Sequence, residues 1–461
     1  MKKILLASIF VLVFLGGCHS HTQYLESNLT IPENYTFDTN KNGTNISVSW
    51  WENFNSSALN SLIEQAKLNS PDSLIAVQRL EQSRLQLENA GISHYPGLDL
   101  SAGTSMNRAR GDDGWGAISR STSASLRVGY EIDLWGKIAG QKEAAHSSYL
   151  ATKYGKDATM LTLYSSVAQS YFNLLATTER LKIAKENLQI SEELLRIVNA
   201  KYNAGSISSL DVNQQQSSYL SQKANVENLE LQLKQYKNAL ATLVGIVPQN
   251  YTFLGDDFWS LNIPQVEAGL PSKLLLNRPD IAMARENVNI ANAVTKVANA
   301  NRFPSFSISA SGGVSSAGLI SFADPTSVLS LGLNAVYTLF DWGRLKNLKE
   351  IEVSRTKEAI LNYNKAILGA LQESEDALNS VAYQKSQALI QEEIANYTKK
   401  SLDISTMQYK HGIRDFSSLL SAQRDFFSAT DSLAMQRLNH LNSLITLYKV
   451  LGGGWSKDNE L

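Results

Sequence analysis

The stretch DLWG at Asp133–Gly136 decides the fold, because a near copy of it, FDWG, returns at Phe340–Gly343. The tryptophan of the first stretch, Trp135, lies 207 residues before Trp342 in the second. The same spacing separates four further pairs: Tyr202 and Tyr409, Gly205 and Gly412, Gln216 and Gln423, and Gly245 and Gly452. One offset held at landmarks so far apart indicates an internal duplication of the chain.

Each copy is predicted to continue as a long helical hairpin. Apolar or aromatic residues recur at every seventh position of the first copy, at Met160, Val167, Leu174, Leu181, Leu188, Leu195 and Tyr202. A sustained seven-residue repeat is typical of coiled coils. All nine prolines lie outside both copies, as helices of this length require. The first helix, expected over Lys137–Asn203, would be about 100 Å long.

Segments of alternating apolar and polar residues lie ahead of both hairpins and predict β-strands. The four expected strands are Leu98–Met106, Ser121–Ile132, Ser305–Gly313 and Val328–Phe340. A loop joins the two strands of each pair, so each pair is predicted to form a β-hairpin. In the last strand, the small or polar row that would face a lumen consists of Ser330, Gly332, Asn334 and Thr338.

The chain is therefore expected to contain six consecutive segments. They are a signal peptide (1–17), an extended N-terminal segment (18–56), a first repeat (57–245), a linker (246–271), a second repeat (272–452) and a polar tail (453–461). Each repeat is expected to hold short helices, a β-hairpin (98–132 or 305–340) and a long helical hairpin (137–245 or 344–452). Pro-Asp pairs at 71–72 and 279–280 mark a helix start in each repeat, because proline and an acid both suit a first helical turn.

The N-terminus reads as an export signal. Two lysines are followed by the apolar run Ile4–Leu15, which is too short to span a bilayer. The segment ends in LGGC at Leu15–Cys18, which resembles a lipobox, the bacterial signal that leaves a lipid-modified cysteine at the mature N-terminus. Cys18 is the only cysteine in the chain, so an internal disulfide is excluded. An ordinary signal peptide with an incidental cysteine is the alternative.

Membrane crossing is predicted to depend on strands. After the signal, no segment is long and apolar enough for a transmembrane helix. A chain that crosses a bilayer without such a helix must use a closed barrel. Four strands are too few, because known barrels have at least about eight. Several chains would therefore share one pore, with the helical hairpins assembled as a tube beneath it.

Together these features resemble the outer membrane factor family, the TolC-like efflux ducts, and within it the lipoprotein branch that is similar to OprM and CusC. The residues that carry the resemblance are Cys18, Trp50-Trp51 with Phe54, the two Trp-Gly stretches, the turns Tyr202–Gly205 and Tyr409–Gly412, and Ala422-Gln423-Arg424. The resemblance covers nearly the whole mature chain. His19 stands where lipoproteins held at the inner membrane carry aspartate, so the resemblance implies anchoring at the outer membrane.

The resemblance implies an α+β membrane protein built as a homotrimer. Three chains would form a twelve-stranded β-barrel in the outer membrane and a twelve-helix barrel that crosses the periplasm. The implied partners are outer membrane lipid, a periplasmic adaptor (membrane fusion protein) and an inner-membrane pump. The implied function is passive export of small molecules, namely drugs, toxic compounds or metal ions, with no enzymatic activity.

The resemblance also places functional residues near the periplasmic tips. The turns expected to meet the adaptor contain Tyr202, Gly205, Tyr409 and Gly412. Asp211 and Arg414 would form a latch that holds the tips shut, with Tyr409 assisting. Taken singly, each of these charges also fits a solvated turn residue, and an exposed pair contributes only about 0–1 kcal/mol.

The constriction is expected just beyond the second turn. Its residues would be Asp415, Phe416, Ser418, Leu419 and Ser421. Ser418 and Ser421 stand where acids often ring the opening in this family, which leaves Asp415 as the nearest acid. Phe416 and Leu419 are the candidate apolar plugs.

Three other readings are open to the sequence. A type I protein secretion duct would share the whole architecture. A trimeric coiled-coil surface protein without a pore is disfavoured, because it has no use for four alternating strands. An enzyme or metal protein is disfavoured because the six histidines lack ligand spacing and neither a phosphate loop nor a nucleophile–base set is found, so no catalytic residue, metal ligand or cofactor is expected. The net charge of −1 gives no electrostatic footprint for nucleic acid.

Overall fold

A computed structural model of the chain describes residues 46–253, 255–266, 277–318, 320–453 and 455. The predicted signal peptide and the expected lipidation site, Cys18, lie outside these residues. The described residues divide into two compact units. The first holds Gln86–Ser148 and Asn287–Asn362, and the second holds the other described residues. Each unit therefore draws on both repeats, so the units do not follow the repeat boundaries expected from the sequence.

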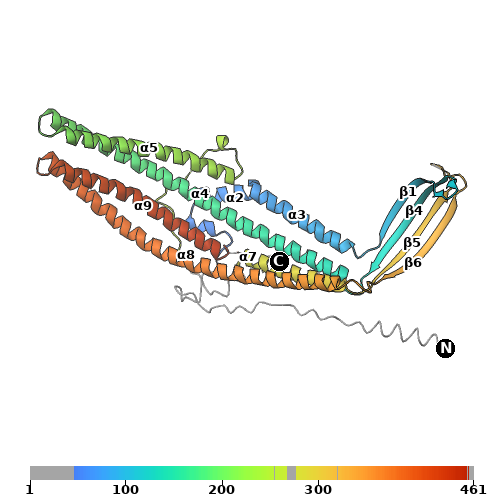
Figure 1. The fold of residues 1–461 in the computed structure, drawn as a ribbon. Coiled ribbons are helices and arrows are strands. Elements are labelled where there is room, and N and C mark those ends of the chain that lie inside the picture. The colour runs from blue at the N-terminus through green and yellow to red at the C-terminus, as the bar shows by residue number, and fades with distance from the viewer. Residues whose placement is uncertain (1–45, 254, 267–276, 319, 454, 456–461) are drawn as a thin grey trace. The chain divides into compact units, whose positions relative to one another are not determined.

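The first unit contains a four-stranded antiparallel sheet with the strand order β1-β4-β5-β6 (Figure 1). Its strands are β1 (Gly97–Asn107), β4 (Ser119–Ile132), β5 (Ser305–Ser316) and β6 (Thr326–Val336). A small ribbon of β2 (Arg110–Gly111) and β3 (Gly114–Trp115) lies in the loop between β1 and β4. Both predicted strand pairs are present, and the pairing of β4 with β5 joins them into one sheet.

The last strand is shorter than predicted. The sequence pattern extends it to Phe340, but β6 ends at Val336. Val336 pairs with Ser305, the first residue of β5, and the residue before it is Pro304, which has no backbone N–H to continue the ladder. The residues after Val336 therefore have no partner strand among the described residues, and Thr338 lies outside the strand in which it was expected.

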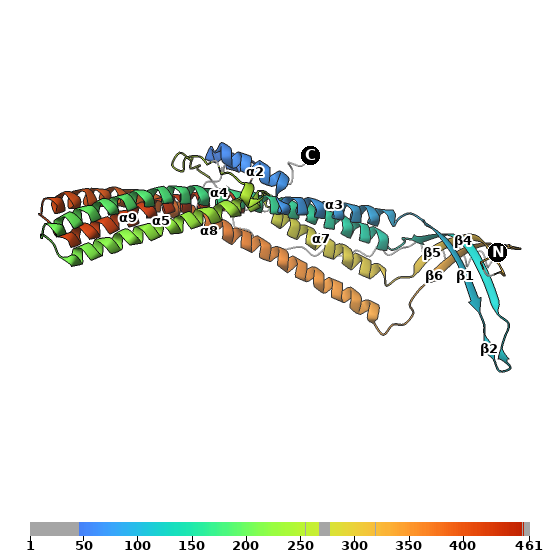
Figure 2. The ribbon, with the colours of Figure 1, turned by 90° about the horizontal axis from the view of Figure 1, so that it is seen from above.

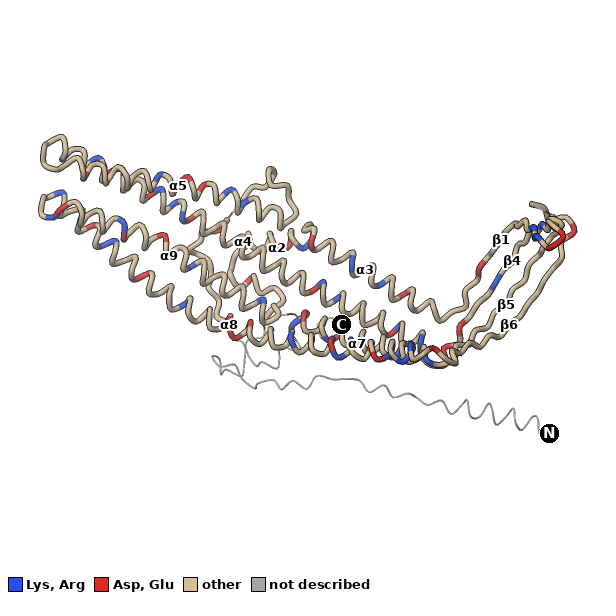
Figure 3. The backbone as a smooth tube through the Cα atoms, viewed as in Figure 1, with Lys and Arg blue, Asp and Glu red and all other residues tan. Residues whose placement is uncertain are grey.

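The two faces of the sheet differ in chemistry. In β6, Leu329 and Leu331 are strongly exposed on one face. Serine and glycine alternate with the apolar residues, and on the opposite face the hydroxyls of Ser311 and Ser330 are 2.7 Å apart in a hydrogen bond between β5 and β6. Neither β5 nor β6 contains a charged residue, so both strands are tan throughout Figure 3. The sheet thus carries an apolar face without cover. Its other face has small, hydroxyl-bearing residues in β5 and β6, and in β1 and β4 it also has Asp99, Arg127 and Glu131.

Two long helical hairpins account for most of the helix. The first consists of α4 (Lys137–Asn203) and α5 (Ser209–Leu243), and the second of α8 (Arg344–Lys410) and α9 (Phe416–Val450). α4 and α8 have 67 residues each, and α5 and α9 have 35 each. Every bound in the second hairpin lies 207 residues after its counterpart, which confirms the duplication. Figures 1 and 2 show α5 and α9 beside the later parts of α4 and α8.

The seven-residue row of α4 forms a packing seam. Val167, Leu174 and Leu181 are buried, whereas Tyr202 at the end of the row is exposed. Full burial of such a side chain stabilises the fold by about 1.5–3 kcal/mol, so the seam holds the hairpins together over many turns. None of the described helices is both long enough and apolar enough to cross a membrane.

Short helices precede the strands in each repeat. α2 (Ser57–Asn69) and α3 (Pro71–Ile92) belong to the first repeat, and α7 (Pro279–Ala300) belongs to the second. α3 and α7 have 22 residues each and begin at the Pro-Asp pairs seen in the sequence. Asp72 and Asp280 lie in their first turns, where a negative charge offsets the positive end of the helix dipole.

Aromatic residues near the start of the described chain form the centre of the second unit. Trp50 begins the short helix η1 (Trp50–Phe54), and its ring stacks on Tyr448 of α9 with 5.1 Å between the centroids. Phe54 meets Phe172 of α4 edge-on at 5.0 Å. Aromatic rings bury much apolar surface when they pack in this way. This segment is therefore fixed to helices of both repeats.

The linker between the repeats is held by Arg437 of α9. Its guanidinium donates to the backbone oxygens of Phe258, Trp259 and Leu261 at 2.9–3.2 Å. It also lies over the rings of Phe258 and Trp259. One half-buried arginine thus satisfies three carbonyl groups of an irregular segment that has no helix or strand to do so.

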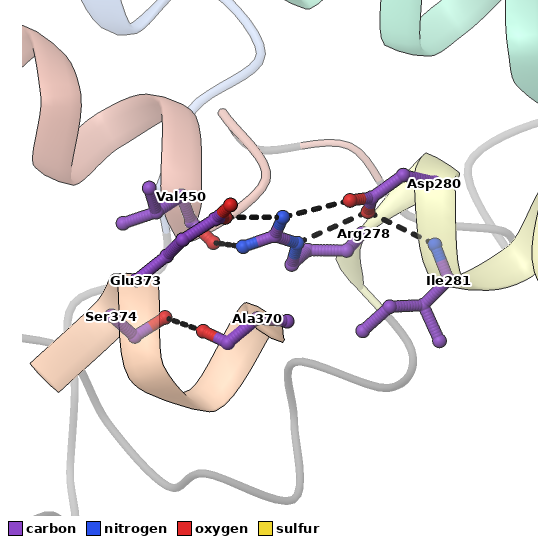
Figure 4. A network of polar contacts seen from close by, with 7 residues as sticks. All are labelled: Arg278, Asp280, Ile281, Ala370, Glu373, Ser374 and Val450. Atoms are coloured by element: carbon purple, nitrogen blue, oxygen red, sulfur yellow. Dashed lines mark hydrogen bonds and ion pairs between the residues drawn. The ribbon is translucent and has the colours of Figure 1, made fainter. Parts of the chain in front are cut away.

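Arg278 connects α7, α8 and α9 (Figure 4). It is only 8% exposed, and its Nη1 donates to the backbone oxygen of Val450 at 3.0 Å. Its Nη2 contacts Asp280 at 2.7 Å and Glu373 at 2.8 Å. Although burial opposes the charge, hydrogen bonds to the two acids raise the pKa of Arg278. Burial likewise opposes the charge of Asp280, but the bond from Arg278 lowers its pKa. The network fixes the end of α9 against the start of α7.

Replacing Arg278 with alanine is expected to destabilise the fold by about 2 kcal/mol, because the Val450 carbonyl and two partly exposed carboxylates lose a charged donor. Thermal unfolding followed by circular dichroism measures the change. Arg285→Ala is the matched control, because Arg285 is an exposed arginine of the same helix. Equal unfolding temperatures for the two variants would show that the network adds no stability.

The Arg278→Ala effect should also depend on pH. Because the pKa of Asp280 is lowered in the folded chain, its contribution is present above its ordinary pKa of 3.8 and is lost as the pH falls towards the lower folded value. The difference between Arg278→Ala and the unsubstituted chain should therefore shrink below that pH. A difference that stays constant through this range would exclude the Asp280 carboxylate as the partner that matters.

Candidate functional site

The candidate site lies at the two turns that join α4 to α5 and α8 to α9. Gly205 and Gly412 adopt φ angles of 73° and 74°, in the left-handed region where other residues are strained. Their amides close the turns on the carbonyls of Tyr202 and Tyr409, at 2.9 and 3.1 Å. A Cβ added at either glycine would meet no atom within 4 Å. The glycines are thus required by the turn, and space is open beside both of them.

Behind the turns, an apolar cluster joins the two hairpins. Its buried members are Leu194, Val198, Leu402, Tyr409, Phe416, Leu419, Leu420, Phe426 and Phe427. Tyr409 is 3% exposed and its ring centroid is 5.8 Å from that of Phe416. Its counterpart in the first repeat, Tyr202, is 46% exposed. The two tips therefore share a sequence pattern but differ in how their tyrosines are packed.

Two of the five predicted constriction residues belong to this cluster. Phe416 and Leu419 are 5% and 1% exposed, so in the single chain they pack between its own helices. The reason is their place on α9, whose first turn directs its apolar side chains into the cluster. Of the other predicted positions, Ser421 is exposed and Ser418 is half-buried.

Asp415 caps the N-terminus of α9. Its carboxylate accepts a hydrogen bond from the amide of Ser418 at 3.1 Å and one from the hydroxyl of Ser417 at 3.2 Å. The bonds from Ser418, with smaller contributions from Ser417 and from the charge of Arg414, lower the pKa of Asp415. The acid expected at the constriction is therefore also a helix cap, a role that aspartate commonly fills.

Asp211 and Arg414, the predicted latch, do not meet within one chain. Asp211 is half-buried at the start of α5, where it accepts a hydrogen bond from the backbone N–H of Ser208 at 3.3 Å. Arg414 is exposed. In the part of the chain that the structure describes, no ion pair includes either residue. Both charges are thus left without a charged partner in the single chain.

The charge of Asp211 affects the pKa of Tyr409. Burial, and to a lesser degree the negative charge of Asp211, raise the pKa of the Tyr409 hydroxyl. That hydroxyl is buried and has no hydrogen-bond partner among the described residues. An unpaired buried hydroxyl costs free energy, so a carboxylate that moved slightly to accept its proton would be stabilised. No hydrogen bond joins Tyr409 to Asp211 among the described residues, and the assisting role of Tyr409 in the latch stays a prediction.

Lys201 is a tip residue that the sequence reasoning missed. Its ammonium donates to the Tyr409 carbonyl at 2.9 Å and lies 4.6 Å from the centroid of the Tyr409 ring. That carbonyl is in the last turn of α8, at the negative end of the helix dipole, where a cation is stabilising. Lys201 thus joins the end of α4 to the end of α8. A basic residue in the last turn of α4 was the available signal, but its partner lies in the other repeat and could not be read from local sequence.

The comparisons with known proteins bear on this arrangement. The chain matches the family described as outer membrane efflux protein over residues 62–246 and 270–453, one match in each repeat. It is 34% identical over 471 residues to the pyoverdine export outer membrane protein OpmQ of Pseudomonas aeruginosa, with 100% of this chain and 98% of the relative covered. It is 28% identical to the cation efflux system protein CusC of Escherichia coli O6:H1, with 99% and 100% covered.

The fold also matches a solved channel. The crystal structure of the open state of the Neisseria gonorrhoeae MtrE outer membrane channel aligns with a TM-score of 0.81 and 28% identity, over 95% of this chain and 99% of that one. The described residues include no group of three or more His, Cys, Asp or Glu side chains that could hold a metal ion.

Replacing Lys201 with methionine is expected to loosen the end of α8. The variant keeps the long side chain but loses the ammonium, so the last turn should open more often by about 1 kcal/mol, or roughly fivefold. Hydrogen–deuterium exchange of residues 405–412 measures this opening. Lys410→Met is the matched control, since Lys410 is exposed in the same turn. Unchanged exchange in the Lys201 variant would contradict the role given to this contact.

Proposed function

The chain belongs to the outer membrane efflux protein family, and we propose that three copies of it form the channel of a tripartite efflux system. It is an outer membrane efflux protein, and its family and structural neighbours are channels rather than enzymes. The observation that carries the proposal is the sheet, which has one exposed apolar face and one polar face of small, hydroxyl-bearing and charged residues. The first face suits lipid and the second suits a water-filled lumen.

One chain has too few strands to form a closed barrel, so several chains would have to form it together. One chain supplies four paired strands and the four long helices α4, α5, α8 and α9. Three chains would give a twelve-stranded barrel and a twelve-helix tube, as the sequence resemblance implies. β1 and β6 are the edges of the sheet in a single chain, so each has a free side on which a neighbouring copy could pair.

We further propose that the tips dock a periplasmic adaptor that recruits an inner-membrane pump. The support is the exposure of Tyr202 and Ile413 beside the two turn glycines, together with the open space around Gly205 and Gly412. Backbone that carries no side chain allows a partner helix to approach closely.

The latch would act between neighbouring chains. Asp211 and Arg414 each lack a charged partner within one chain, and opposite charges repeated three times around one mouth could pair across the contacts between chains. Each exposed pair contributes about 0–1 kcal/mol, so three pairs would bias the mouth towards closure by at most about 3 kcal/mol. The unpaired hydroxyl of Tyr409 supports the same arrangement, because Asp211 is the charge beside it.

The substrate proposed is a small organic molecule. The relative with 34% identity is named for pyoverdine export, while the one named for cation efflux has 28%. In β5 and β6 the polar face of the sheet carries serine and glycine, and in β1 and β4 the same face carries Asp99, Arg127 and Glu131. It therefore offers hydrogen bonds together with charges of both signs, which suits the passage of polar organic molecules. Selection would then rest with the pump and adaptor. Comparing export of pyoverdine-type molecules with metal tolerance in a deletion strain distinguishes the two substrate classes.

Cys18 is proposed as the lipid attachment site that supplements the sheet in holding the chain at the outer membrane. The support is its position at the end of LGGC and its being the only cysteine. The mass of the mature N-terminus would show the acyl chains, and an unmodified cysteine would contradict the proposal.

Gly412→Arg is expected to reduce export at least tenfold while the assembly remains intact, because a long charged side chain would fill the space left open for the adaptor. Accumulation of a dye substrate in cells measures export. Gly412→Asn is the matched control, since asparagine tolerates a left-handed backbone and is short. Loss of export in both variants would point to turn geometry, and normal export in the arginine variant would contradict docking at this turn.

The double variant Asp211→Ala with Arg414→Ala is expected to raise the single-channel conductance of the purified protein in planar bilayers, because the closed mouth loses its paired charges. The variant should also admit bulky antibiotics into cells. Asp425→Ala with Arg424→Ala, two exposed charges further along α9, is the control. Equal conductance in the two double variants would show that Asp211 and Arg414 are only solvated turn charges.

A further inference from the structure

An aromatic joint connects the two repeats inside the chain. Trp135 follows β4, and its ring stacks on Phe303 with 4.9 Å between centroids and 23° between the planes. The indole N–H of Trp135 donates to the carbonyl of Pro304 at 2.6 Å. Pro304 comes directly before β5, the strand that pairs with β4. The joint therefore holds the end of the first β-hairpin against the start of the second.

Because of the duplication, counterparts of these joint residues lie next to the two edge strands of the sheet, after β6 and before β1. Trp342 is the counterpart of Trp135, and Tyr95-Pro96 is the counterpart of Phe303-Pro304. In the single chain, however, Trp342 is 88% exposed and Tyr95 is 72% exposed. Each aromatic side chain thus lacks the partner that its counterpart has in the other repeat.

The ends of helices α3 and α7 show the same difference in exposure between the two repeats. Ile92, near the end of α3, is 55% exposed, whereas its counterpart Ala300, at the end of α7, is 5% exposed. An exposed isoleucine in place of a buried alanine indicates a surface that is covered in the assembled protein.

The strand pairing inside the chain also predicts which backbone residues would pair between copies. Residues of β1 recur in β5 after 208 positions, and residues of β4 recur in β6 after 207. Within the chain, Glu131 of β4 lies opposite Ser307 of β5. Their counterparts are Thr338 and Asp99, at the two free edges of the sheet.

When the β4–β5 register is applied to β6 of one copy and β1 of the next, apolar residues lie opposite apolar residues. Ile132 lies opposite Phe306 within the chain, and their counterparts are Leu339 and Leu98, both exposed apolar residues. The residues that follow Val336 would then gain the partner strand that the single chain lacks. The strand predicted to reach Phe340 would regain its full length.

We propose that the aromatic joint recurs between copies of the chain. Trp342 of one copy stacks on Tyr95 of the next and donates its indole N–H to the carbonyl of Pro96, while Tyr337–Phe340 extend β6 along Gly97–Leu100 of that copy. The occupant is a second copy because this chain itself carries both halves of the joint. A head-to-tail contact of this kind closes a ring when the rotation from each copy to the next adds up to a full turn. The inference rests on the proposed assembly and specifies its register.

Disulfide formation tests the register directly. Thr338→Cys and Asp99→Cys in one chain place two thiols directly opposite each other across the joint, where Cβ atoms are about 4.5–5.5 Å apart. Oxidation should link the copies into a closed species that denaturing electrophoresis resolves as three chains and that reduction returns to one. Thr338→Cys with Ser101→Cys is the matched control, two residues out of register, and the single variants control for pairing with Cys18.

The outcomes separate this inference from the proposed function. Stronger linking in the control pair, or no linking in an assembly that native mass spectrometry shows to be intact, would overturn the register while leaving the channel in place. A protein that remains a monomer would instead contradict the proposed assembly.

The tryptophan has its own test. Trp342→Ala should lower the temperature at which the assembly dissociates in detergent, and Trp342→Phe should restore part of the loss, because it keeps the stacking but not the N–H. Trp135→Ala, the counterpart inside the chain, should instead lower the stability of the folded chain. If Trp342 faces lipid, its alanine variant dissociates at the unchanged temperature, and the proposed contact is excluded.

Discussion

Backbone hydrogen bonding at the two edges of the sheet is the constraint on which the rest of this structure depends. β1 and β6 each have a partner strand on one side only, and the sheet presents an uncovered apolar face that includes Leu329 and Leu331. Unpaired N–H and C=O groups beside such a face cannot be satisfied by lipid. In the proposed assembly, neighbouring copies satisfy them.

Because the chain is duplicated, the strand pairing found between β4 and β5 can also pair the free edges of β6 and β1 from neighbouring copies. Where the repeats differ, the difference marks a specific role. Lys201 reaches the carbonyl of Tyr409, whereas the corresponding position in the second repeat is Gln408, so the tips are joined in one direction only. Arg278 binds the end of α9, and the first repeat has Ser70 in its place. Both ends of the second hairpin are therefore held by residues outside it, the end of α8 by Lys201 and the end of α9 by Arg278.

Sequence reasoning predicted the duplicated hairpins well, because a constant offset and a seven-residue repeat are local signals that fix where long helices begin and end. It failed where the deciding partner was distant. The end of the last strand depends on which strand lies beside it, and within the chain that strand begins only at Ser305. For Phe416 and Leu419, the resemblance gave no sign of the tip cluster in which both side chains pack within one chain, and their role at the constriction stays a prediction. Lys201 was missed because its contact joins helices of two different repeats. Whether Asp211 meets Arg414 depends on a neighbouring copy, which no single-chain pattern specifies.

The most direct test of this account is the number of chains in the purified assembly. Native mass spectrometry of the protein released from detergent micelles measures that number without assuming any activity. The account predicts a single dominant species of three chains, because a twelve-stranded barrel needs three chains of four strands each. A stable monomer, or a dominant species with any other number of chains, would contradict it.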